Sequence, residues 1–177
     1  MFRKLIYTVT LLTLIAFGSA ATAAQPITEA EVLAAQKAWG EGIVAIGKAF
    51  TDHGDYAAAA QKHLDTLYGY DAGPVLFKPT KAAEDQFRET EEQALSYFVK
   101  GIVPEDKGFA INPWTNVRFD NHQIVLDGPM AIAMGNYYFT DPKGTETKVE
   151  YVFGYKKADD GRVLITLHHS SLPYAPH

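Results

Sequence analysis

Polar side chains without a formal charge gather near the C-terminus, where the sequence alternates like a β-strand. His169 and Ser171 stand two residues apart in the segment 162–172. Residues two apart on a strand lie about 6.6 Å from each other on the same face. An imidazole with an ordinary pKa of about 6.5 carries protons at neutral pH, and a hydroxyl both donates and accepts hydrogen bonds. This pair therefore suits a ligand of only a few atoms, held by hydrogen bonds or changed by proton transfer.

The lengths of two turns add further polar residues to this pair. A three-residue loop at 159–161 sets Tyr151 opposite His169 in the expected sheet. Counting on through a four-residue loop at 141–144 sets Asn136 on the same face. That face is mostly apolar and is expected to lie inside. The residues predicted to converge at one end of an apolar cavity, as in a ligand pocket, are Asn136, Tyr151, His169 and Ser171.

Each candidate also has a purely structural interpretation. A buried histidine is often a hydrogen-bonded core residue, and Ser171 has the position of a strand-end hydroxyl that bonds to backbone. Tyr97 lies on a helical stripe, where a tyrosine commonly packs in the core. Thr80 follows Pro79 and has the position of a cap on a short helical turn. The pattern therefore indicates a pocket without naming a reaction.

Three expected helices precede the strands that carry most of these residues. A T-x-x-E capping box at residues 28–31 opens a long amphipathic helix that ends before Asp52. Asp55 is the expected N-cap of a second helix, which runs to about Tyr68. A T-x-x-Q capping box at residues 90–93 opens a third helix, which precedes Gly101.

The periodicity changes from helical to alternating after these helices. Four strands are expected at 117–126, 130–140, 148–156 and 162–172, joined by turns rich in Asp, Gly and Pro. Helices followed by a curved antiparallel meander predict an α+β fold with the long helix in the concave face of the sheet. This order resembles the nuclear transport factor 2-like cone, a fold that hosts enzymes, binding modules and association domains.

The N-terminal segment has the pattern of a secretory signal peptide. Arg3 and Lys4 precede an apolar run at 5–17, and small residues follow at 18–21. The run is shorter than the roughly 20 residues of a spanning helix, although a retained membrane tether is the alternative. We therefore expect residues 1–24 to be removed. Residues 25–177 then form a single domain, periplasmic or secreted and free of the membrane.

Composition narrows the partners of that domain. The chain has no cysteine, so neither a disulfide framework nor a thiolate metal site is available. The formal charge is −5, and loss of the two cations Arg3 and Lys4 takes it to −7. An acidic chain without a basic run argues against a nucleic-acid partner. Small molecules or other subunits are the expected partners.

Five longer stretches resemble the iota-class carbonic anhydrases. They are residues 68–80 (YGYDAGPVLFKPT), 94–98 (ALSYF), 109–114 (FAINPW), 135–139 (GNYYF) and 167–173 (LHHSSLP). The resemblance spans most of the expected domain. It implies a cone fold, a homodimer, and the interconversion of carbon dioxide and bicarbonate.

The resemblance also implies site residues. The expected catalytic residues are Thr80, Tyr97, His169 and Ser171, and the expected substrate-binding residues are Asn136, Tyr151 and Ser170. In this interpretation Tyr97 and Thr80 orient water or bicarbonate. Ser171 donates to an oxygen of the anion, and His169 moves or orients the proton.

Cofactor and function each keep an alternative at this stage. No cofactor is expected, with zinc as the alternative, because catalytic zinc needs three protein ligands and the adjacent His168 and His169 point to opposite faces of a strand. A non-enzymatic ligand-binding or association module would have the same core. An isomerase or dehydratase of steroid-like substrates would need an inward carboxylate; Glu150 is expected to face outward, which leaves Asp65 or Glu84.

Overall fold

The computed structural model describes residues 25–176. Its helices and strands are α1 (Glu29–Thr51), α2 (Tyr56–Leu67), β1 (Leu76–Lys78), α3 (Glu91–Val99), β2 (Asn116–Asp127), β3 (Met130–Thr140), β4 (Glu146–Lys157) and β5 (Val163–Ser171). The predicted signal peptide, residues 1–24, lies outside the described residues. Within the described part of the chain, no helix is long and apolar enough to cross a membrane.

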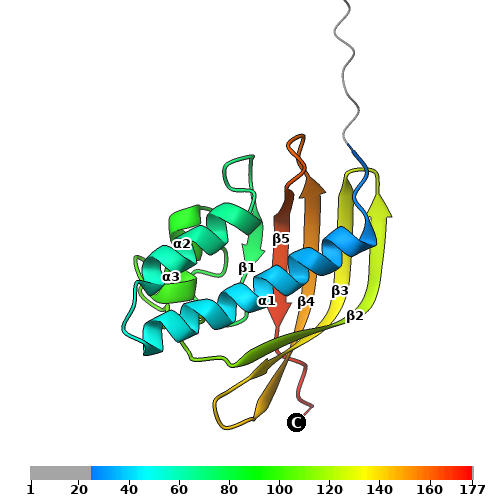
Figure 1. Cartoon of the computed structure of the whole chain (residues 1–177). Helices are drawn as coiled ribbons and strands as arrows, with labels where there is room; N and C mark the ends of the chain where they lie inside the picture. Colours follow the sequence, from blue (N-terminus) through cyan, green and yellow to red (C-terminus); the bar gives the residue numbers. More distant parts are fainter. Residues whose placement is uncertain (1–24, 177) are drawn as a thin grey trace, which may run out of the picture.

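The long helix α1 crosses the concave face of a curved sheet, and α2 and α3 lie beside the β1 edge (Figure 1). The strand order is β1-β5-β4-β3-β2. β2 to β5 form the antiparallel meander expected from the sequence. The short strand β1 instead pairs parallel with β5, a pairing that the sequence did not predict. The α+β cone itself is confirmed.

The start of α1 is fixed by local hydrogen bonds that the sequence signalled. Thr28 Oγ1 accepts a 3.3 Å bond from the Glu31 amide, and the Glu31 carboxylate accepts a 2.9 Å bond from the Thr28 amide. Lys157 at the end of β4 adds a 2.7 Å ion pair to Glu31. The hydrogen bonds from Lys157 and Thr28 lower the pKa of Glu31 to about 2. The capping box therefore also ties the helix to the sheet.

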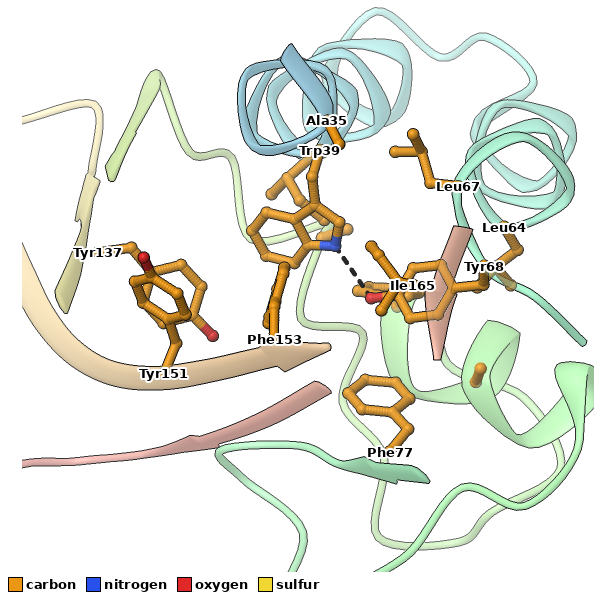
Figure 2. Close-up of a cluster of buried hydrophobic side chains, with 14 of the residues drawn as sticks. Ala35, Trp39, Leu64, Leu67, Tyr68, Phe77, Tyr137, Tyr151, Phe153 and Ile165 are labelled. Carbon is orange, nitrogen blue, oxygen red and sulfur yellow. Dashed lines mark hydrogen bonds between the residues drawn. The ribbon is translucent and has the colours of Figure 1, made fainter. Parts of the chain in front are cut away.

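The space between α1 and the sheet is filled mainly by aromatic rings. Trp39 points from α1 towards Phe153 on β4, with Tyr137 and Tyr151 to one side (Figure 2). The ring centroids of Trp39 and Phe153 are 5.7 Å apart, in an edge-to-face arrangement. Burying one large apolar side chain contributes roughly 1.5–3 kcal/mol. This core is the rigid frame in which the polar groups described below are held.

A β-bulge changes which side chains of β5 face this core. Tyr155 lies opposite Ile165, as predicted, but Gly154 lies opposite Leu167. Thr166 is thus an extra residue on β5, and the alternation of faces shifts by one residue after it.

The predicted inward orientation of His169 and Ser171 is therefore wrong. His169 is exposed and Ser171 is half-buried on the outer face. His168 and Ser170 point inward in their place, and each is only 2% exposed. The bulge is the physical reason, because a slip of one residue turns every following side chain of a strand to the other face.

The orientation predicted for Asn136 is also wrong. Thr140 lies opposite Glu146 instead of Thr145, and the Asp141 amide donates a 3.0 Å bond to the Thr145 carbonyl oxygen. The turn inside this pair, residues 142–144, is one residue shorter than expected, and Gly144 in it has φ 83°. Asn136 consequently lies opposite Glu150 and faces outward.

Candidate active site

His168 stands in a buried chain of polar groups within the aromatic core. Its Nδ1 lies 2.7 Å from the Tyr68 hydroxyl, which accepts a 2.9 Å hydrogen bond from Trp39 Nε1. Its Nε2 lies 3.4 Å from the Tyr137 hydroxyl and 3.4 Å from the Ser170 hydroxyl. The two ring nitrogens thus face two different sets of partners.

Aromatic side chains hold the imidazole of His168 in place. Phe77 stacks on it with centroids 4.5 Å apart and planes at 15°, and the Phe153 centroid is 4.1 Å away. Burial lowers the pKa of His168 well below its usual value, and the nearby His63 and His169 act in the same direction. The ring is therefore uncharged at neutral pH.

Tyr137, which contacts His168, also lies near two residues expected from the sequence, Thr80 and Tyr97. Burial raises the pKa of Tyr137, and hydrogen bonds with Ser170 and Thr80 oppose the rise. Burial also raises the pKa of Tyr97, the neighbouring Tyr137 adds to the rise, and a hydrogen bond from the Lys81 amide opposes it. Both phenols stay protonated at neutral pH and act as donors.

We call these residues the hydroxyl cluster, and its members are Thr80, Tyr97, Tyr137, His168 and Ser170. Four parts of the fold supply them. Thr80 follows β1, whose parallel pairing sets Phe77 beside His168 on β5. Tyr97 comes from α3 and Tyr137 from β3. None of the five carries a formal charge at neutral pH, so the cluster offers hydrogen bonds to an anion without a fixed charge to neutralise.

A pocket of about 410 Å³ adjoins the cluster at Tyr97. Lys81 and Lys107 bring positive charge to its lining, and Glu105 and Asp106 bring negative charge. Tyr97 also stacks on Phe109, with centroids 5.5 Å apart, so its ring is held at this boundary. The pocket gives solvent an approach to the Tyr97 side of the cluster.

The remaining predicted residues lie elsewhere. Asn136, His169 and Ser171 do come together, but in a depression on the outer face of the sheet that Glu150 also lines. Ser171 Oγ donates a 3.3 Å hydrogen bond to the Glu150 carboxylate there. The sequence-based register therefore grouped these three residues correctly and placed them on the wrong side.

Tyr151 is buried, as predicted, but its hydroxyl serves another group. It donates to the Asn121 side-chain oxygen and accepts a 3.2 Å bond from Gln36 Nε2. Gln36 and Asn121 in turn bond to each other at 2.8 Å in both directions. Burial raises the pKa of Tyr151 to about 12. These hydrogen bonds are separate from those of the hydroxyl cluster, although the Tyr151 ring packs on Tyr137 with centroids 5.2 Å apart.

The sequence-based reasoning missed Trp39, Tyr68, Tyr137 and His168 as site residues. The signal for His168 was Gly154, because a glycine inside a strand often marks a bulge or a close approach of the backbone. A Cβ at Gly154 would lie 3.0 Å from the Cβ of Leu167. Treating Gly154 as the site of a bulge would have turned His168 and Ser170 inward.

The described residues contain neither a metal-binding group of side chains nor an inward carboxylate at the positions considered. Among residues 25–176, no group of three or more His, Cys, Asp or Glu residues is placed to hold a metal ion. Glu150 faces outward, as predicted, and Asp65 and Glu84 are exposed. None of these three carboxylates supplies the inward base that an isomerase or dehydratase would need.

Sequence comparison relates this chain to one enzyme family. The model of the metal-independent carbonic anhydrase family, MICAH, matches residues 30–172. A metal-independent carbonic anhydrase of Nostoc sp. (strain PCC 7120 / SAG 25.82 / UTEX 2576) is 48% identical over 153 residues, which cover 84% of this chain and 75% of the relative.

Solved structures agree with this relation. The crystal structure of a cyanobacterial iota-carbonic anhydrase complexed with bicarbonate has a TM-score of 0.84 and 45% identity, over 89% of this chain and 99% of that chain. A Xanthomonas campestris structure assigned to the calcium/calmodulin dependent protein kinase II association domains has a TM-score of 0.56 and 25% identity, over 90% and 100% of the chains. An NTF2-like family structure from Streptomyces avermitilis, assigned to the dehydratases, has a TM-score of 0.54 and 15% identity over 82% of this chain and 96% of that chain, and is alike in fold alone.

Because two imidazoles are buried in the neutral form, we expect acid to lower the free energy of unfolding. Burial lowers the pKa of His63 to about 4, and the pKa of His168 is also lowered. In the unfolded chain these histidines bind protons near pH 6.5. Their contribution to the unfolding free energy is therefore fully present above that pH and decreases as the pH falls towards 4. For His63 the loss is about 3 kcal/mol over this range. Urea denaturation at pH 7.5, 6 and 5 measures it.

A His63→Leu variant separates the two contributions, and His122→Gln, at an exposed histidine, is the matched control. We expect His63→Leu to flatten the fall in unfolding free energy between pH 6 and 5 by about half, and the control to keep the wild-type slope. An unfolding free energy that is constant from pH 7.5 to 5 in the wild type would show that neither imidazole is buried in its neutral form.

Proposed function

The chain belongs to the metal-independent carbonic anhydrase family, and we propose that it interconverts carbon dioxide and bicarbonate at the hydroxyl cluster. The observation that supports this location is the convergence of the Tyr137 and Ser170 hydroxyls on the Nε2 side of a neutral, clamped His168. The cluster brings several hydrogen-bond donors together, and a planar anion with three oxygens needs such a set of donors. The solved relative complexed with bicarbonate is consistent with a ligand of this size.

Hydration joins a water oxygen to the carbon of carbon dioxide and releases one proton. As the new C–O bond forms, one C=O electron pair moves onto its oxygen, which becomes the anionic end of bicarbonate. In our proposal, N–H and O–H groups of His168, Ser170 and Tyr137 face that oxygen. Preorganised donors of this kind contribute about 3–4 kcal/mol to the stabilisation of developing charge.

Thr80 and Tyr97 have the complementary role in this proposal. Each hydroxyl accepts one hydrogen bond while it donates another, so both orient the attacking water and pass on its proton. Tyr97 also borders the pocket that reaches the surface, so the proton leaves on that side. The net reaction turns carbon dioxide and water into bicarbonate and one proton that the solvent receives.

The cofactor assignment follows from the family. Its description as metal-independent supports the metal-free expectation over the zinc alternative. The donors named above are hydroxyls and one neutral imidazole, which suit hydrogen bonding to an anion.

Adjacent residues on β5 give a sharp test of the site. His168→Asn and Ser170→Ala remove inward groups, whereas His169→Asn and Ser171→Ala remove their outward neighbours. In stopped-flow hydration of carbon dioxide by the protein without residues 1–24, in metal-free buffer, we expect His168→Asn to lose about 100-fold in kcat/KM and Ser170→Ala about 10-fold. The outward variants should stay within about two-fold of the wild type.

Circular dichroism of each variant checks that a loss of activity is not a loss of fold. The reverse pattern, with activity lost only in the His169 and Ser171 variants, would contradict the inward site and favour the sequence-based assignment. A wild-type protein without activity above buffer, with or without added metal, would contradict the carbonic anhydrase function itself.

We also propose that two copies of the chain form a homodimer through the outer face of the sheet. Ile132 and Met134 on β3 are 52% and 51% exposed, and Val125 on β2 lies beside them at 55%. An apolar patch of this kind on a soluble domain commonly marks an interface. A twofold axis would bury the same patch on both copies. The resemblance to the iota class supports a dimer independently.

Met134→Glu tests this interface, because it places a charge at the centre of the patch. We expect size-exclusion chromatography with light scattering to give a dimer for the wild type and a monomer for Met134→Glu. Leu33→Glu, at an exposed apolar residue of α1, is the control and should remain dimeric. A monomeric wild type, or a Met134→Glu dimer of undiminished stability, would argue against this face.

We propose that residues 1–24 direct export and are then removed. The supporting features are Arg3 and Lys4, the apolar run, and small residues before the expected cleavage after Ala23 or Ala24. Expression of the full chain in a bacterium with two membranes should yield periplasmic protein whose mass corresponds to a start at Ala24 or Gln25. Leu12→Arg, which interrupts the apolar run, should retain the precursor inside the cell. Full-length protein in the periplasm would argue against cleavage.

A further inference from the structure

The hydroxyl of Tyr68 lies between Trp39 and His168, behind the hydroxyl cluster. Figure 2 shows the Trp39 ring and Tyr68 with the hydrogen bond between them. Trp39 and Tyr68 are each 1% exposed, and His168 is 2% exposed. Bulk solvent is therefore excluded from these groups, and the three side chains satisfy one another's hydrogen bonds.

The direction of each hydrogen bond among Trp39, Tyr68 and His168 follows from which atoms can donate. An indole N–H only donates, so the Tyr68 oxygen accepts the 2.9 Å bond from Trp39. The proton of the Tyr68 hydroxyl then needs an acceptor of its own. His168 Nδ1, at 2.7 Å, is its other partner. If Nδ1 carried a proton, the Tyr68 oxygen would accept twice and its own buried proton would have no acceptor in this chain.

The direction of these bonds assigns the tautomer of His168. A neutral imidazole carries one proton, so an Nδ1 that accepts from Tyr68 leaves that proton on Nε2. Nε2 is the nitrogen that lies 3.4 Å from both Tyr137 and Ser170. Phe77 stacks on the ring at 4.5 Å, which keeps the two nitrogens from exchanging places by rotation.

We propose that Tyr68 is a positioning residue that holds His168 in the tautomer with its proton on Nε2, so that the imidazole presents an N–H to the substrate side. This inference rests on the proposed function, because it concerns the group that faces bicarbonate. In the resting enzyme His168 is then a hydrogen-bond donor, and Nε2 does not accept a proton from water. Deprotonation of the water is left to the hydroxyls of the cluster.

The same hydrogen bonds exclude proton transfer from His168 through Tyr68 to Trp39. A chain that ends at Trp39 cannot carry a proton onwards, because the indole nitrogen has no lone pair to accept one. Tyr68 therefore anchors the imidazole and does not act as a proton wire. The proton released by hydration leaves on the opposite side, past Tyr97.

Nitrogen-15 NMR of the uniformly labelled protein tests the tautomer directly. The signals of His168 are identified by their loss in His168→Asn, and the two-bond couplings to ring protons show which nitrogen is protonated. In the wild type at pH 7.5 we expect an unprotonated Nδ1 and a protonated Nε2. A wild-type signal with the proton on Nδ1 overturns the proposal, whatever the variants do.

Tyr68→Phe removes only the hydroxyl that selects the tautomer. Without it, one nitrogen of His168 lacks a partner in either tautomer, and the hydroxyls of Tyr137 and Ser170 can donate as well as accept. We expect a mixture of both tautomers and a loss of about 10-fold in kcat with KM within about two-fold. A Tyr68→Phe protein that keeps a single Nε2–H tautomer would show that Tyr68 does not select it.

Tyr155→Phe is the matched control, because the Tyr155 hydroxyl is equally buried but forms no hydrogen bond with Trp39, Tyr68 or His168. It should keep the wild-type tautomer and activity. The two measurements also separate this inference from the proposed function. A wild type with the expected tautomer but no hydration activity would contradict the function alone, whereas an active enzyme with its proton on Nδ1 would contradict the role of Tyr68 alone.

Discussion

The extra residue that Thr166 adds to β5 determines which side chains of that strand reach the interior. A regular ladder from Tyr155 and Ile165 onwards would have turned His168 and Ser170 to the outer face. The bulge lies beside Gly154, where a side chain on β4 would crowd Leu167. The polar centre of the molecule therefore depends on a local irregularity of the sheet, and the aromatic core around it depends on the regular parts.

Burying an imidazole and several hydroxyls inside an aromatic core carries a cost, because each polar group loses its hydrogen bonds with water. The structure offsets this cost by pairing these groups with one another. Trp39 donates to Tyr68, and Tyr68 bonds to His168. The contacts on the Nε2 side are longer, at 3.4 Å each. That side is the less satisfied one, and it is where a small ligand gains most by adding its own oxygens.

Much of the fold could be predicted from the sequence because its signals are local. The capping boxes at Thr28 and Thr90 and the strand periodicity each depend on residues close together in the chain, and the elements they predict are present. The parallel pairing of β1 with β5 joins segments far apart in sequence, and no local pattern predicts it. Thr80 and Tyr97 were identified by resemblance to a family and not by periodicity. The predicted faces of His169 and Ser171 were wrong because the count assumed a regular ladder beyond Thr166. The predicted face of Asn136 was wrong because the turn between β3 and β4 is one residue shorter than the count assumed.

Stability and chemistry are linked through the same burial. Desolvation keeps His168 neutral, which permits a single tautomer with a defined donor, and the same desolvation makes protonation of His168 unfavourable to the folded state. His63 contacts both Trp39 and Tyr68 and is buried in the same way, so it shares this dependence without belonging to the cluster. Gly42 leaves the space for that ring, since a Cβ there would lie 2.1 Å from His63 Nδ1. The packing of α1 on α2 therefore helps to keep His168 uncharged, because it holds in place the aromatic rings that exclude water from that residue.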